Sequence, residues 1–230
     1  RGGRPARRPG GRRAAVVLAR LACGGGEVGA ATGSDHLCGS RFRGHSAHAL
    51  WPRPYTAESL AHVVDRVGRV QDHLGRRILL ENPSSYVGFA GSTMTEVQLL
   101  NELVDRTVCR LLCDVSNVYL SAHNMGYDAH AYIDGLPAEA ITELHLGGFT
   151  PEDDEATPGG VVLIDTHATE VARPAWDLYA YALGRFGLKP TLIEWDNDIP
   201  ALTTLLSQAA VADAVAANTL ATEAPRVAAG

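Results

Sequence analysis

Carboxylate and imidazole side chains stand where the apolar runs of this 230-residue sequence end. In the stretch ILLENPSSY, residues 78–86, three apolar residues lead directly to Glu81 and Asn82, and Pro83 then prevents further strand pairing. A run that is apolar on both faces is typical of a parallel strand buried between two layers of helix. An acid at the carboxyl end of such a strand occupies the position at which α/β barrels carry their catalytic groups.

The other apolar runs of the chain also end in groups that can ligate a metal. Together the strand ends supply Asp35, His36, Glu81, Asn82, Asp114, Asn117, His145, Asp165, His167, Glu194 and Asp196. Because the carboxyl ends of parallel strands lie on one face of a barrel, these side chains are expected to converge. Converging carboxylates repel one another unless a cation lies between them. Imidazoles and carboxylates without thiolates suit iron, manganese or zinc in an open catalytic site.

Each of these residues also has a simpler interpretation when it is taken alone. A single Asp or Glu at a strand end is more often a helix cap or a solvated loop residue, and a lone His145 is more often a core histidine. Asn82 serves equally well as a ligand or as the side chain that orients Glu81. Cys109 and Cys113 are expected to be small core residues. The recurrence of acids and histidines at five strand ends favours a metal site over these simpler interpretations.

Helical patterns alternate with the strands that must position these groups. The expected strands are a weak one around His36 and the ranges 78–82, 110–118, 141–148, 161–167 and 191–195. Thr56 is expected to cap a helix over residues 57–74 that Gly75 ends. Thr93 and Glu96 are expected to form a capping box for a second helix that runs to about residue 105. Pro174 and Pro200 are expected to begin two more helices.

This alternation predicts an α/β protein with a parallel sheet wound in a right-handed, barrel-like way. A closed barrel of this kind has about eight strands, and only about five can be counted here. The hydrophobic fraction of 46% is that of a globular protein with a sizeable core.

Charge and cysteine content exclude some classes of function. The net charge is −6, although residues 1–31 hold seven of the 20 basic residues and one of the 26 acidic ones. The acidic remainder argues against a nucleic-acid groove and is compatible with cation binding. No apolar run approaches the ~20 residues that cross a bilayer, so no membrane partner is expected. The four cysteines show no CxxC or disulfide-framework spacing, which favours a reducing cytoplasm.

The two ends of the chain differ in composition from the middle. Residues 1–32 are rich in Arg and Gly and are expected to be a disordered or misread leader, with a targeting signal or a basic tail as alternatives. Residues 33–218 are expected to form the barrel domain, and residues 219–230 a disordered tail.

Five motifs carry a resemblance to a known family. ENPSSY, CDVSNVY, ELHLGGF, LIDTH and LIEWDNDIP occur in this order, and roughly residues 33–210 resemble the domain-of-unknown-function 692 family. This family is also called the uncharacterised protein family 0276 or the multinuclear non-heme iron-dependent oxidases. The resemblance implies a TIM (β/α)8 barrel of the xylose-isomerase-like type, N-terminally incomplete here. It implies two or three iron ions, dioxygen as co-substrate, and oxidation of a cysteine in a ribosomally made precursor peptide that a partner protein presents.

The resemblance also implies a set of ligands in this chain. The implied metal ligands are His36 (or Asp35), Glu81, Asn82, Asp114, Asn117, His145, Asp165, His167 and Glu194. Glu81, Asp114 and His145 are the expected catalytic residues, with Glu81 as a carboxylate that could bridge two irons. The sequence departs from the family where Phe149 replaces a second histidine, where Gly39 replaces a tryptophan, and where three expected strands should precede residue 34.

Two other functions remain open from the sequence. One is a divalent-metal isomerase or hydrolase on the same barrel, which needs no dioxygen. The other is a non-catalytic remnant that binds no metal. The bound metal and the consumption of dioxygen distinguish the three.

Overall fold

Five short parallel strands form the sheet on which the acids and histidines are arranged. The computed structural model describes residues 11–42 and 45–223. Its sheet has the order β1-β4-β5-β6-β9, with β1 (Ser34–His36), β4 (Leu79–Glu81), β5 (Arg110–Asp114), β6 (Ile141–Gly147) and β9 (Thr191–Glu194). All four pairings are parallel, so the carboxyl ends of the strands lie along one edge. Within the described residues, β1 and β9 each pair on one side alone, so the sheet is open.

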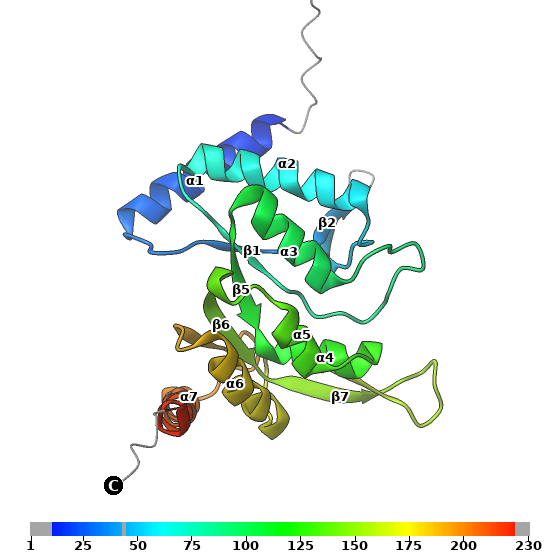
Figure 1. Cartoon of the computed structure of the whole chain (residues 1–230), viewed down its shortest axis with the longest axis vertical. Coiled ribbons are helices and arrows are strands. Elements are labelled where there is room, and N and C mark those ends of the chain that lie inside the picture. The colour runs from blue at the N-terminus through cyan, green and yellow to red at the C-terminus, as the bar shows by residue number, and fades with distance from the viewer. Residues whose placement is uncertain (1–10, 43–44, 224–230) are drawn as a thin grey trace, which may run out of the picture.

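Helices connect the strands and cover the sheet (Figure 1). They are α2 (Ala57–Leu74), α3 (Glu96–Thr107), α4 (Val115–Met125), α5 (Ala129–Gly135), the 3-10 turn η1 (Ala138–Ala140), α6 (Arg173–Phe186) and α7 (Leu202–Glu223). The core includes Leu80, Leu111, Leu144 and Leu146 from the strands, all at most 4% exposed. The order of these strands and helices along the chain is the alternation expected of a xylose-isomerase-like barrel.

The local signals that predicted the first of these helices are confirmed. The Thr56 hydroxyl accepts a hydrogen bond of 3.2 Å from the Ser59 amide, and Gly75 ends α2 in the left-handed conformation. The capping box of α3 was predicted two residues too early, because two overlapping sequences fit the same pattern. It is formed by Thr95 and Gln98, whereas the Thr93 amide donates to the Tyr55 carbonyl at 2.8 Å.

Two strand predictions were wrong. Residues 161–167 were expected to join the parallel sheet, but β8 (Val161–Asp165) pairs antiparallel with β7 (Phe149–Asp153) in a separate hairpin. An apolar run shows that a strand is buried and does not show which strand it pairs with. The predicted strand over residues 110–118 ends at Asp114, because the Asp114 carboxylate accepts from the Asn117 amide and caps α4.

The chain also contains elements that were not among those expected from the sequence. A second hairpin, β2 (Gly39–Phe42) with β3 (His45–Trp51), precedes α2. A helix, α1 (Gly11–Glu27), lies in the leader that was expected to be disordered, and it packs against α2 (Figure 1). Residues 12–22 of this helix are rich in Ala, Leu and Arg, which have high helix propensity, whereas its last turn is Gly-rich. At the other end α7 runs to Glu223, and residues 1–10 and 224–230 lie outside the described residues. In the part of the chain that the structure describes, no helix is long and apolar enough to span a membrane.

Candidate metal centre

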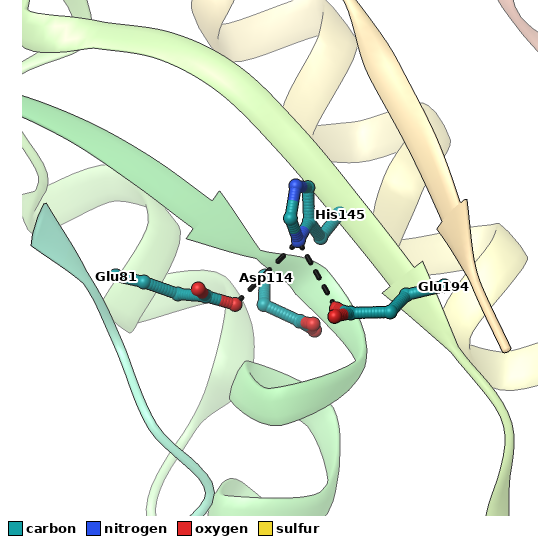
Figure 2. Close-up of side chains that lie close together, drawn as sticks. All are labelled: Glu81, Asp114, His145 and Glu194. Carbon is teal, nitrogen blue, oxygen red and sulfur yellow. Dashed lines mark hydrogen bonds and ion pairs between the residues drawn. The ribbon is translucent and has the colours of Figure 1, made fainter. Parts of the chain in front are cut away.

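Four strand ends bring Glu81, Asp114, His145 and Glu194 together (Figure 2). One ligand atom from each lies within 4.8 Å of those of the other three. His145 Nδ1 is 3.2 Å from a Glu194 carboxylate oxygen and 3.6 Å from one of Glu81. The parallel register explains the convergence, since it sets Asp114 beside His145 and Glu194 beside Gly147. Glu81, Asp114 and His145 are buried, whereas Glu194 remains partly exposed.

A second group of ligand atoms shares one residue with the first. It consists of His167, Glu194 and Asp196, and the Asp196 side chain is 66% exposed. His167 Nδ1 lies 3.6 Å from Asp196 Oδ2 and 3.8 Å from the same Glu194 oxygen that faces His145. The amides of Asp196 and Asn197 both donate to the His167 carbonyl, so the backbone fixes these two turns against each other. Glu194 therefore lies between two adjacent groups of ligands.

Three more of the expected ligands lie at the margin of these groups. His36 Nε2 is 3.5 Å from Glu81 Oε2, on the side of Glu81 away from His145, and its side chain is 39% exposed. Asp165 Oδ1 is 2.7 Å from His167 Nε2. Asp35 is exposed, and its carboxylate accepts from the His36 amide, so the geometry favours His36 over Asp35 as the ligand from this strand.

Asn82 and Asn117 hold Asp114 in place. The Asn82 side chain donates to the Asp114 carbonyl at 2.9 Å and accepts from the Asp114 amide at 3.0 Å. The Asn117 amide donates to Asp114 Oδ1 at 2.7 Å, and its side-chain nitrogen donates to the Asn82 carbonyl at 3.2 Å. These bonds use both polar ends of the Asn82 side chain, which supports its role as an orienting group. Asn117 Oδ1 is buried and has no hydrogen-bond partner among the described residues.

The donor set fits a bound cation. Asp114 is fully buried, and its Oδ2 makes no hydrogen bond within the described part of the chain. Burial raises the pKa of Asp114 to about 7, because an ionised carboxylate is poorly solvated there. An unpaired buried carboxylate oxygen is costly unless a cation or a donor meets it. Glu81, Asp114 and His145 would hold a divalent metal ion, which would supply that missing partner.

The two histidines of the site also have shifted pKa values. Burial lowers the pKa of His145, but the carboxylates of Glu194 and Glu81 outweigh burial and raise it to about 10. For His167 burial is likewise outweighed, chiefly by Asp165, and its pKa rises to about 9. The hydrogen bond from His145 keeps the pKa of Glu194 below its usual range. In the metal-free protein, protonated imidazoles therefore provide the positive charge that the carboxylates require.

Sequence reasoning left out some residues of this site. Glu143 Oε1 lies 3.6 Å from His145 Nε2, and its other oxygen accepts from the Thr32 hydroxyl. The sequence could have predicted this contact, because residues two apart in a strand, such as 143 and 145, lie on the same face. Asp196 was noted at its strand end without being assigned as a ligand, yet it belongs to the second group.

Gly147 leaves room for the His167 ring. A Cβ at this position would lie 2.6 Å from the nearest ring atom, so the imidazole must move in Gly147→Ala. We expect this variant to keep the first group and to weaken binding at the second by roughly ten- to 100-fold, the usual effect of misplacing a ligand. Metal content after anaerobic reconstitution with ferrous iron measures the effect.

Gly68→Ala is the matched control, because a Cβ on Gly68 in α2 meets nothing within 4 Å. Equal metal content in the two variants would show that His167 does not ligate the metal.

Comparison with known proteins identifies a matching family. The family model "RiPP precursor modification enzyme MbnB/TglH/ChrH" matches residues 14–217. A UPF0276 protein of Anaeromyxobacter sp. (strain Fw109-5) is 48% identical over 188 residues, which cover 82% of this chain and 64% of that protein. One of Rhizorhabdus wittichii is 45% identical over 195 residues, covering 85% of this chain and 67% of that protein. The chain thus spans about two thirds of the length of these curated relatives.

Solved structures confirm the fold. A xylose isomerase-like TIM barrel protein from Mycobacterium smegmatis, in complex with magnesium, has a TM-score of 0.57 at 13% identity. The match covers 91% of this chain and 69% of that one. D-psicose 3-epimerase from Clostridium cellulolyticum H10 has a TM-score of 0.50 at 12% identity, covering 94% of this chain and 72% of that one. The fold is therefore of the xylose-isomerase-like TIM barrel type predicted from the sequence, with five strands of the barrel sheet among the described residues, and the chain belongs to the MbnB/TglH/ChrH family of RiPP precursor modification enzymes.

Proposed function

We propose that this chain carries the metal centre of an iron- and dioxygen-dependent enzyme that oxidises a cysteine in a ribosomally synthesised precursor peptide. The observation that carries the proposal is the pair of adjacent ligand groups joined at Glu194. Two neighbouring groups of mixed imidazole and carboxylate ligands suit more than one iron ion. Membership of the family supports a precursor peptide as the substrate. A partner protein that presents the peptide, and a location in the cytoplasm, are part of the same proposal.

The ligands divide between two positions. Glu81, Asp114, His145 and Glu194 form the first, and His167, Glu194 and Asp196 the second, with His36 and Asp165 beside them. Glu194, which belongs to both groups, would then be shared between the two positions, a role that the family resemblance implied for Glu81. A third ion, if the centre holds one, has His36 and Glu81 as its nearest pair of groups.

Bound iron supplies the one-electron and dioxygen chemistry that side chains lack. The protein residues orient the ligands and manage protons. Asn82 and Asn117 fix Asp114 through their hydrogen bonds, and the buried first group excludes water from one side of the centre. A substrate thiol must lose its proton before it can ligate a metal. The Asp196 side chain is 66% exposed, so the centre is open to solvent on that side, where a substrate thiol can enter and release its proton.

A second function has one observation in its favour. The ligand set is dominated by carboxylate oxygens, which also suit magnesium or manganese. The xylose isomerase-like protein from M. smegmatis was solved with magnesium. A divalent-metal isomerase or hydrolase that uses no dioxygen is therefore the alternative, followed by a non-catalytic remnant.

Anaerobic reconstitution with ferrous iron distinguishes these functions. We expect more than one iron per chain by elemental analysis, and dioxygen uptake after air is admitted together with a cysteine-containing precursor peptide. The same peptide with serine in place of cysteine is the control and should give no uptake above the peptide-free rate. Activity with manganese or zinc under anaerobic conditions would support the isomerase or hydrolase. A chain that binds no iron, manganese or zinc would support the remnant.

A further inference from the structure

A separate cavity of about 540 Å³ lies outside the metal centre, and none of the ligands described above lines it. Its walls come from the segment before α2, the loop between β4 and α3, the start of α3, and the junction of α4 with α5. Those walls are mainly apolar and aromatic, and include Tyr55, Phe89, Met125, Tyr127 and Tyr132. Cavities of this size hold small ligands or single side chains in many proteins.

One acid in this cavity has a carboxylate oxygen without a hydrogen-bond partner among the described residues. Glu96 lines the wall, and its Oε1 is buried without a hydrogen-bond partner among the described residues. The hydroxyl of Tyr132 is likewise buried without such a partner. Burial raises the pKa of Glu96 to about 7, against the opposing influence of the Tyr55 and Tyr132 hydroxyls. Glu96 is the first residue of α3, and a first-turn acid stabilises a helix without needing to be buried.

We propose that this cavity binds the side chain of a basic residue of the peptide substrate, an inference that rests on the proposed function. Tyrosine faces attract a cation, and a carboxylate in the same apolar pocket pairs with it. The apolar stem of lysine or arginine suits the walls formed by Phe89 and Met125. Arg53 also lines the cavity, but its Nε is directed to the Ser59 hydroxyl at 3.4 Å. With Asp128, the lining holds two acids against this one base.

Two segments connect the cavity to the metal centre. Ser85, which lines the cavity, follows Glu81 by four residues on one continuous segment. Helix α4 is capped by Asp114 at one end and reaches Met125 in the cavity wall at the other. A helix of this length spans roughly 16 Å at about 1.5 Å per residue. An extended peptide covers that distance in about five residues. The basic residue is therefore placed roughly five positions from the cysteine that is modified.

Small probes test the cavity without metal or dioxygen, so the result is independent of the proposed chemistry. The metal-free full chain is titrated with N-acetyl-lysine methylamide and with the uncharged N-acetyl-norleucine methylamide, and binding is followed by ligand-observed NMR. We expect the lysine probe to bind at least about fivefold more tightly, the order of effect of a desolvated cation–aromatic and carboxylate contact. We expect Glu96→Gln to remove this preference while leaving the norleucine affinity unchanged.

Asp105→Asn is the matched control, because Asp105 is an exposed acid on the same helix. It changes the net charge by the same amount and should keep the lysine preference. The proposal is overturned if both probes bind equally, if neither binds, or if the preference survives in Glu96→Gln. Iron binding is measured separately, so that loss of the metal centre and loss of the cavity are distinguished.

Discussion

Glu194→Gln is expected to remove iron from both ligand groups at once. The glutamine keeps the size of the side chain but replaces one carboxylate oxygen by an amide nitrogen that cannot ligate. Glu194 is the single residue common to both groups, and the same oxygen faces His145 at 3.2 Å and His167 at 3.8 Å. The hydrogen bond from His145 keeps the pKa of Glu194 below its usual range, so its carboxylate is ionised at neutral pH. Loss of a shared charged ligand should weaken each position by more than the roughly ten- to 100-fold that loss of a ligand-orienting group costs.

Iron content after anaerobic reconstitution measures this prediction. Asp196→Asn is the informative comparison. Asp196 belongs to the second group alone, so this variant should lose only the ion of the second group. Glu155→Gln changes an exposed acid outside both groups and should leave the iron content unchanged. If Glu194→Gln lost no more iron than Asp196→Asn, Glu194 would not be the shared ligand.

Glu194 also shows how far sequence reasoning reaches in this site. Its position at a strand end was readable, because the apolar run before it and the turn after it mark the boundary of a buried strand. That Glu194 belongs to two ligand groups could not be read from the sequence, because this depends on where the turn at His167 lies. His167 follows the β7–β8 hairpin, which lies outside the sheet, and no periodicity in residues 161–167 distinguishes a hairpin from a barrel strand.

Asn82 and Asn117 show a different limit. Each is a chemically reasonable ligand from its type and place. In the structure they also hold Asp114 through a network that joins β4 to the start of α4, while Asn117 Oδ1 keeps no hydrogen-bond partner among the described residues. The sequence predicted a strand through residue 118, and that prediction hid the helix cap that directs Asn117 toward Asp114. Side chains that cap helices and side chains that ligate metals are drawn from the same residue types, so only the geometry separates them.

Asp114→Asn is expected to stabilise the metal-free protein and to abolish its stabilisation by iron. The asparagine oxygen can still accept from the Asn117 amide, so the cap of α4 is kept. The change removes a fully buried carboxylate whose Oδ2 has no hydrogen-bond partner among the described residues. Burial raises the pKa of Asp114 from 3.8 to about 7. The folded state therefore holds this proton more tightly than the unfolded state does.

The sign of the pH dependence follows from that difference. Between about pH 4 and pH 7 the unfolded chain has lost this proton and the folded chain has kept it, so the free energy of unfolding falls as the pH rises. Each pKa unit corresponds to about 1.4 kcal/mol. Between pH 5 and pH 8 the free energy of unfolding of wild type should therefore fall by roughly 2–3 kcal/mol relative to that of Asp114→Asn. Urea unfolding with a chelator present, followed by circular dichroism, measures the gap at the two pH values. Asp105→Asn, at an exposed site, should show no such gap.

Ferrous iron should make wild type more stable than Asp114→Asn, the reverse of the order without metal. A ligand that binds the folded state alone stabilises it in proportion to the logarithm of its concentration over its dissociation constant. Wild type should therefore gain stability with added iron, whereas Asp114→Asn, lacking the buried anion, should gain little. The buried charge that weakens the empty protein is the same charge that draws the metal into the site, so stability and metal affinity should change in opposite directions at this position. An Asp114→Asn protein that gained as much from iron as wild type would remove Asp114 from the ligand set.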